Sequence, residues 1–276
     1  MSLLTITYPA IDPIAFSIGP VAVKWYGLAY MTGLLFGWYY IKKLLRTPRL
    51  WATGKPPMAI DKVDDLLLWL VFGVIIGGRL GYVFFYQPAY FAAHPLQIFA
   101  TWHGGMSFHG ALVGCGLAIW LFSKRAAVNV WSVMDLCAAS VPIGLVFGRL
   151  ANFINGELWG RTTDVAWGMV FPDREAGPLP RHPSQLYEMF FEGIMLFILL
   201  RIMTHKKLAL QSPGLVIGMF LVGYGFARSF CEFFREPDVG HILTIGPFTA
   251  GIIYSIPMIL LGLYFIRSSR HRAIVQ

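Results

Sequence analysis

The segment 148–161, with the sequence GRLANFINGELWGR, places polar side chains at the end of a strongly apolar run. Arg149, Asn152 and Asn155 lie three residues apart, so in a helix they share one face. Guanidinium and amide groups together suit a phosphate, which arginine binds through two parallel hydrogen bonds. Arginine does not act as a base, because its pKa lies above about 12. The segment therefore predicts a binding site for an anion.

Two further segments carry ionisable groups at helical spacing. Tyr224, Arg228 and Glu232 are four residues apart, and so are Glu188 and Glu192. Membrane helices turn such groups toward a cavity or toward one another, because each charge in lipid costs about 2.5–3.5 kcal/mol. A structural ion pair between arginine and glutamate is the alternative for any single residue. The complete set predicts a polar chamber between helices.

A histidine, an arginine and several glycines belong to neighbouring apolar runs. His109 is the candidate base, because histidine titrates near neutral pH. Arg79 is interpreted as a structural residue. Gly104 precedes a predicted helix, where backbone N–H groups can bind an anion. Gly110 and Gly114 lie four residues apart, the spacing that lets membrane helices pack closely.

The composition identifies the elements that must position these groups. Of 276 residues, 57% are hydrophobic and 13% are charged, whereas about a quarter of the residues in a soluble domain are charged. About 20 apolar residues cross a bilayer as a helix. We therefore predict an all-α polytopic membrane protein that forms one domain over residues 1–276. The seven expected spans are residues 18–41, 66–86, 106–123, 131–153, 186–204, 213–232 and 247–266.

The basic residues indicate the orientation of the spans. Lysine and arginine follow the first, third, fifth and seventh spans, as they do in cytoplasmic loops, so the N-terminus is expected outside and the C-terminus inside. This pattern also accounts for the net charge of +8, so we expect no nucleic-acid partner. The first residues lack a basic region, and no cleavable signal peptide is expected. At about 1.5 Å per residue, Arg79, Arg149 and Arg228 fall in the outer half of the membrane, and Asp135 at its inner surface.

The segments outside the spans also have distinct compositions. Residues 158–183 combine glycine, proline and charges of both signs, and we expect them to form a small extracytoplasmic head. Residues 87–103 are interpreted as an amphipathic arm on the outer surface. The three cysteines lie in apolar runs and are expected to be buried as small hydrophobic residues. No metal-binding motif is visible, so no metal is expected.

A phosphate bound at lipid depth is most simply the headgroup of a phospholipid. The residues alone leave two classes open: an enzyme, and a phospholipid transporter or flippase with an arginine-lined headgroup site. A transporter favours polar access from both leaflets and often an internal repeat, whereas these charges lie toward one side. A lipid phosphatase or hydrolase ranks third, because no metal motif, GxSxG motif or acid triad is seen.

Six segments resemble the prolipoprotein diacylglyceryl transferases of bacteria. They are KWYGLAY (24–30), GGRLGYVFFY (77–86), GGMSFHGALVG (104–114), GRLANFINGELWGR (148–161), RHPSQLYE (181–188) and YGFARSFCEFFREPD (224–238). These segments follow the order and spacing of the family over most of the chain, and the pattern GRxxNFxNGExxG is specific to it. The resemblance implies a seven-span bundle with a periplasmic head in the bacterial cytoplasmic (inner) membrane.

The resemblance also implies the reaction. An sn-1,2-diacylglyceryl group moves from phosphatidylglycerol to the lipobox cysteine thiol of a preprolipoprotein, giving a thioether and glycerol 1-phosphate. No cofactor is implied, because phosphatidylglycerol carries its own leaving group. Arg149 and Arg228 would bind the lipid phosphate, and His109 would act as base or orient the thiol. We expect Arg149→Ala and Arg228→Ala to be more damaging than His109→Ala.

The implied substrate-binding residues are Tyr26, Gly104, Asn152, Asn155, Glu157, Gly160, Tyr224, Glu232 and Arg235. For two of them another interpretation stays open. Tyr26 could belong to an aromatic belt at the membrane surface, and Glu157 could form a loop ion pair with Arg161.

Overall fold

The computed structural model describes residues 6–9, 11–237 and 249–274. Residues 247–248, the beginning of the seventh expected span, lie outside this described part. The chain divides into two compact units, one formed by residues 1–41 and 135–276 and the other by residues 42–134. Each unit is described by itself.

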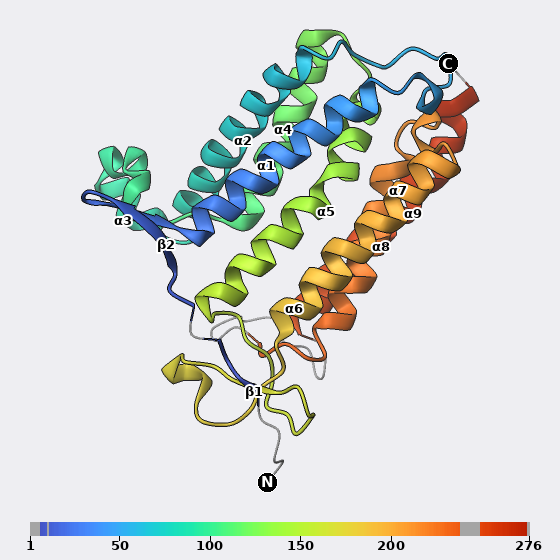
Figure 1. The fold of residues 1–276 in the computed structure, drawn as a ribbon. Helices are drawn as coiled ribbons and strands as arrows, with labels where there is room; N and C mark the ends of the chain where they lie inside the picture. The colour runs from blue at the N-terminus through green and yellow to red at the C-terminus, as the bar shows by residue number, and fades with distance from the viewer. Residues whose placement is uncertain (1–5, 10, 238–248, 275–276) are drawn as a thin grey trace. The chain divides into compact units, whose positions relative to one another are not determined.

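The first unit contains most of the long helices (Figure 1). Three helical segments follow one another without a break: α6 (Ser184–Glu188), the π-helix η5 (Met189–Met195) and α7 (Leu196–Lys206). The other helices are α1 (Trp25–Leu45) and α5 (Val130–Asn155), which both continue into the second unit, and η4 (Arg174–Ala176), η6 (Ala209–Gln211), α8 (Leu215–Cys231) and α9 (Ala250–Ile274).

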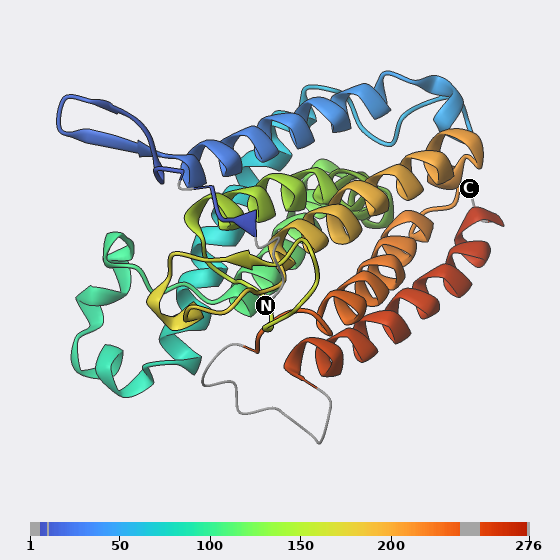
Figure 2. The same cartoon turned by 60° about the horizontal axis from the view of Figure 1, so that its bottom comes forward.

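A β-hairpin precedes α1 and replaces the start of the first expected span. Strands β2 (Ile14–Ile18) and β3 (Val21–Lys24) pair antiparallel, with Ile18 opposite Val21. Gly19, at φ +57°, and Pro20 make the turn, because this backbone conformation favours glycine. Residues 18–24 are therefore strand and turn, and the helix begins at Trp25. Figure 2 shows the hairpin projecting beyond the N-terminal end of α1.

The segment after α5 folds back onto the end of that helix. Strand β1 (Ile6–Thr7) pairs parallel with β4 (Met169–Val170), so this segment has short strands beside its turns. A small hydrophobic core of Tyr8, Phe153, Phe171 and Ala176 packs against Met169 of β4. The Tyr8 hydroxyl donates to the carbonyl groups at the end of α5, and burial raises the pKa of this phenol.

Asp135 joins α5 to the beginning of α8. Its carboxylate accepts hydrogen bonds from the backbone N–H groups of Gly214, at 2.7 Å, and Ile217, at 2.8 Å. A carboxylate at a helix N-terminus satisfies N–H groups that lack partners in the helix. Asp135 is completely buried. It therefore has defined partners inside the protein, and its place at the inner surface of the membrane stays a prediction.

The second unit is built on two closely packed helices, α2 (Lys62–Phe85) and α4 (Phe108–Ala126). A Cβ added at Gly77 would lie 2.5 Å from the Gly110 carbonyl oxygen and 2.7 Å from Gly114 Cα. No larger residue fits at this helix crossing, which confirms the packing role predicted for Gly110 and Gly114. The 3₁₀-helix η1 (Pro48–Leu50) precedes α2.

The arm between α2 and α4 consists of three short helices, α3 (Pro88–Ala93), η2 (Pro95–Phe99) and η3 (Thr101–His103). Arg79 holds the arm from inside. Its guanidinium donates five hydrogen bonds of 2.6–3.3 Å to backbone carbonyl groups, namely those of Gln97, Ile98, Ala100, Gly104 and Gly105. The structural role predicted for Arg79 is confirmed.

Helices cover most of each of the seven apolar runs. Within the described residues, α2, α5 and residues 250–272 of α9 are long and apolar enough to cross a membrane, and α8 is a shorter apolar helix. Over residues 6–9, 11–237 and 249–274 the chain is thus mostly helical, as predicted, with four short strands that were not predicted from the sequence. The count of seven spans and the orientation of the termini remain predictions.

Candidate active site

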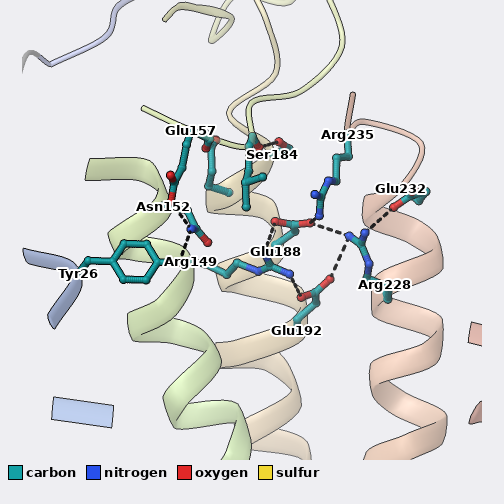
Figure 3. Close-up of polar contacts among 12 residues, drawn as sticks. Tyr26, Arg149, Asn152, Glu157, Ser184, Glu188, Glu192, Arg228, Glu232 and Arg235 are labelled. Atoms are coloured by element: carbon teal, nitrogen blue, oxygen red, sulfur yellow. Dashed lines mark hydrogen bonds and ion pairs between the residues drawn. The ribbon is translucent and has the colours of Figure 1, made fainter. Parts of the chain in front are cut away.

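Arg149 lies in the last two turns of α5 and points toward two glutamates on the α6–η5 segment (Figure 3). One terminal nitrogen lies 3.3 Å from a Glu188 carboxylate oxygen, and the other lies 3.1 Å from Glu192. Both carboxylates are completely buried, whereas 16% of the Arg149 side chain is exposed. The two glutamates share this arginine because they are four residues apart on one helical face.

Arg228, in the last turn of α8, contacts the same two glutamates. Its Nη1 lies 2.7 Å from Glu188 and 3.8 Å from Glu192, and its Nη2 lies 2.8 Å from Glu232 on its own helix. Arg235, just after α8, lies 3.3 Å from Glu188. The helical spacing predicted that Arg228, Glu232 and the two glutamates would converge, and the contacts bear this out, whereas Arg235 was implied only by the family resemblance (Figure 3).

We call these six residues the arginine–glutamate network: Arg149, Glu188, Glu192, Arg228, Glu232 and Arg235. Three guanidinium groups face three carboxylates, so their formal charges cancel. Buried charges of this kind are tolerated when they are paired, and removal of one partner is strongly destabilising. Glu192 belongs to the π-helix η5, and π-helical turns occur frequently at functional sites.

Asn152, one turn beyond Arg149, connects α1 to the loop after α5. Its side-chain amide donates to the Glu157 carboxylate at 2.7 Å and to the Tyr26 hydroxyl at 3.3 Å. The Glu157 carboxylate is thus hydrogen-bonded to the Asn152 amide. The Arg161 guanidinium donates to the Arg235 carbonyl at 3.0 Å and not to Glu157. The alternative ion pair between Glu157 and Arg161 is absent from the contacts of these described residues.

Gly160 allows two parts of the backbone to meet beside the network. Its N–H donates to the His182 carbonyl at 2.9 Å, and it forms a β-bridge with Arg235. A Cβ at this position would lie 2.6 Å from the His182 carbonyl oxygen, so only glycine fits. Gly160 thus positions the segment that carries Arg235.

The start of α9 packs against the end of the network. A Cβ added at Gly251 would approach the Glu232 carboxylate carbon to 2.6 Å. Glycine here leaves room for the carboxylate that pairs with Arg228. Tyr224, one turn before Arg228, stacks on Phe220 with ring centroids 5.8 Å apart. Asn155 is half-buried at the end of α5.

His109 and Gly104 belong to the second unit and are described within it. His109 is exposed in the first turn of α4, with its ring centroid 5.7 Å from that of Phe108. The Gly104 N–H donates to the Thr101 carbonyl at 3.1 Å, and its carbonyl accepts from Arg79. The Gly104 N–H group is therefore already bonded, and the anion contact predicted for it gains no support from this geometry.

Sequence reasoning missed the start of α6, where two side chains bond to the loop after α5. The Ser184 hydroxyl donates to the Leu158 carbonyl at 2.9 Å, and the Gln185 amide donates to the Glu157 carbonyl at 2.6 Å. The signal for Gln185 was its spacing, three residues before Glu188 on the same helical face. In the part of the chain that the structure describes, no group of three or more histidine, cysteine or acidic residues is placed to bind a metal ion.

Comparison with known proteins gives a consistent result. Residues 13–267 match the model of a family described as prolipoprotein diacylglyceryl transferase. A protein of Brucella canis named phosphatidylglycerol–prolipoprotein diacylglyceryl transferase is 53% identical over 261 residues, which cover 94% of this chain and 92% of that protein. Proteins of the same name from Brucella ovis and Brucella suis are 52% identical over the same extent.

Proposed function

The chain belongs to the prolipoprotein diacylglyceryl transferase family, and from this premise we propose that its arginine–glutamate network is the site of lipid transfer. The protein is a transferase that moves the sn-1,2-diacylglyceryl group of phosphatidylglycerol to the cysteine thiol of a prolipoprotein. One observation carries the assignment of the site. Arginines from α5, α8 and the segment after α8 converge on two buried carboxylates of the α6–η5 segment.

In this proposal, Arg149 and Arg228 bind the phosphate of the lipid. Both side chains are partly exposed, whereas the glutamates behind them are completely buried. A phosphate can therefore approach the guanidinium groups from the exposed side while Glu188 and Glu192 hold them from the buried side. Fixed donors of this kind stabilise charge without reorganising during the reaction.

The chemistry is a substitution at the glycerol carbon that carries the phosphate ester. The cysteine sulfur forms a bond to this carbon. The bond between this carbon and the ester oxygen of the phosphate breaks, while the bond between that oxygen and phosphorus stays intact. The electron pair of the broken bond stays on the leaving oxygen, so glycerol 1-phosphate departs with one more negative charge than the diester. The thiol proton is lost before or during the attack. Arg149 and Arg228 stabilise the charge that develops on the phosphate.

The thiol must be oriented and must lose its proton, and His109 is our candidate for accepting the proton or for orienting the thiol. A free thiol has a pKa near 8.5, so forming the thiolate at pH 7 costs roughly 2 kcal/mol. A fixed donor to the developing phosphate charge contributes roughly 3–4 kcal/mol. Loss of either arginine should therefore reduce turnover more than loss of His109.

Tyr26, Asn152, Asn155, Glu157, Gly160, Tyr224, Glu232 and Arg235 form the supporting set in this proposal, with Gly104 in the second unit. Asn152 supports the site through its hydrogen bonds to Glu157 and Tyr26. Gly160 supports it because only glycine leaves room for the β-bridge to Arg235. We place the protein in the bacterial inner membrane, with seven spans, the N-terminus outside and the site toward the periplasm. The basic loops after alternate spans support this orientation.

The experiment is mass spectrometry of a lipobox peptide incubated with the purified protein and phosphatidylglycerol in detergent. A matched peptide with serine in place of the cysteine is the control. We expect a diacylglyceryl adduct on the cysteine peptide alone, with release of glycerol phosphate. Folded protein that forms no adduct, but moves phospholipid between the leaflets of liposomes, would overturn the proposal and favour a transporter.

A further inference from the structure

Gln185 has an amide with one bonded end and one unbonded end. The side chain is completely buried in the first turn of α6. Its Nε2 donates to the Glu157 carbonyl oxygen at 2.6 Å, which fixes the orientation of the amide because a carbonyl only accepts. The other end, Oε1, has no hydrogen-bond partner among the described residues. Native proteins rarely leave such a buried acceptor unsatisfied.

Gln185 lies on the helical face that also carries Glu188 and Glu192. Gln185 precedes Glu188 by three residues and Glu192 by seven, a spacing that repeats on one side of a helix. Its partner Glu157 is bonded through its carboxylate to Asn152, one turn from Arg149. The amide is therefore joined, through two hydrogen bonds, to the helix that carries the proposed phosphate ligand.

Arg149 supplies a second buried atom of this kind. Its two terminal nitrogens contact Glu188 and Glu192, but its Nε, also buried, has no hydrogen-bond partner among the described residues. Three carboxylate oxygens of the network, on Glu188, Glu192 and Glu232, also lack a hydrogen bond, but each lies within ion-pair distance of an arginine. Arg149 Nε and Gln185 Oε1 have neither kind of partner among the described residues. A ligand that completes both must bring an acceptor and a donor.

A phosphate ester of a polyhydric alcohol meets this requirement. Its phosphate oxygens accept from guanidinium, and its hydroxyl groups donate to a carbonyl oxygen. We propose that Gln185 Oε1 accepts a hydrogen bond from a hydroxyl of the glycerol headgroup, so that Gln185 selects the lipid by this hydroxyl. This inference rests on the proposed function, because it concerns the headgroup of the same donor lipid.

The discriminating substrate is a phosphatidylpropanol, which has the same phosphate ester and acyl chains but no headgroup hydroxyl. We would measure kcat/KM for transfer from each lipid to the lipobox peptide. A site that hydrogen-bonds a substrate hydroxyl rejects the analogue that lacks it. We therefore expect the unmodified protein to prefer phosphatidylglycerol by about tenfold or more.

Gln185→Met keeps the length of the side chain and removes the acceptor. It also removes the Nε2 donor to the Glu157 carbonyl, which should lower kcat/KM for both lipids alike. Loss of the acceptor should lower kcat/KM about tenfold further for phosphatidylglycerol alone, and so abolish the preference. Ser184→Ala is the matched control, because it removes the neighbouring hydrogen bond to Leu158 and should preserve the ratio between the lipids. Should Gln185→Met fail to fold, Gln185→Asn keeps both amide groups without adding a charge and should reduce the preference, because its oxygen is withdrawn by one methylene group.

The outcomes separate this inference from the proposed function. No adduct with either lipid from the unmodified protein would mean that the proposed function is wrong. Transfer from both lipids at equal rates would mean that no hydroxyl is recognised. If Gln185→Met lowered kcat/KM equally for both lipids, the residue would serve only to hold Glu157. If kcat/KM did not change for either lipid, the Gln185 oxygen would bind a buried water and not the substrate. Each of the last three results overturns the inference.

Discussion

Replacement of Arg228 tests whether the arginine–glutamate network binds the substrate or only neutralises itself. Arg228 contacts three carboxylates at 2.7, 2.8 and 3.8 Å, and two of them belong to completely buried side chains. Arg228→Ala leaves two guanidinium groups against three carboxylates. Removing one partner from a buried ion pair costs about 3–5 kcal/mol of folding stability. Loss of activity in the single variant would therefore mix unfolding with loss of catalysis.

The double variant Arg228→Ala/Glu232→Gln separates the two effects. It removes one charge of each sign, so two guanidinium groups again face two carboxylates. We expect it to recover most of the stability that the single variant loses, measured by thermal unfolding in detergent followed by tryptophan fluorescence. Activity should stay about 100- to 1000-fold below that of the unmodified protein, because one donor to the developing phosphate charge is missing.

The peptide transfer assay decides between the two roles of Arg228. Glu232→Gln alone is the control, since it keeps every guanidinium group in place. A double variant that regains both stability and turnover would refute the reasoning, because Arg228 would then serve only to balance Glu232. Recovery of stability without turnover would support a direct contact with the phosphate.

Three further predictions concern Arg79, Gly251 and His182. Arg79→Lys should speed hydrogen exchange in the arm between α2 and α4, since lysine has three donors where arginine here makes five hydrogen bonds; unchanged exchange would contradict the role given to this residue. Gly251→Ala should displace the Glu232 carboxylate and lower transfer activity, whereas Gly116→Ala, where a Cβ meets no described atom within 4 Å, should not; equal activities would contradict this. Burial lowers the pKa of His182, so the folded state favours its neutral form; stability should be full above pH ~6.5 and fall as the pH drops below it. His182→Gln should weaken this pH dependence, and thermal unfolding measured between pH 5 and 8 tests it.

The helices and the pairing of the charged residues could be predicted from the sequence. Apolar runs of about 20 residues indicate membrane helices by length alone. The four-residue spacing of Glu188 and Glu192 placed both carboxylates on one face, and the structure shows them sharing Arg149 and Arg228. Local spacing was sufficient here because each helix carries its own pattern.

The remaining features depend on contacts between distant segments. Residues 18–24 are apolar enough for a helix, but the turn at Gly19 and the pairing of Val21–Lys24 with Ile14–Ile18 make them part of a hairpin. Asp135 caps a helix that begins almost 80 residues later, and no local pattern reveals this partner. Arg235 entered the site only through the family resemblance, because its bridge to Gly160 joins segments 75 residues apart in sequence.

The order of the network along the chain has a consequence for its biogenesis. During translation, Arg149 emerges first, followed by Glu188 and Glu192, and only later by Arg228, Glu232 and Arg235. A nascent chain that ends after α7 holds one of these arginines and two glutamates, and so carries an excess negative charge at the future site. The segment from Arg228 to Arg235 supplies two arginines and one glutamate, which restores neutrality. The segment from Arg228 to Arg235 therefore neutralises the charge left on α5–α7. Until it is made, the membrane insertion of α5–α7 carries the free-energy cost of one uncompensated buried carboxylate.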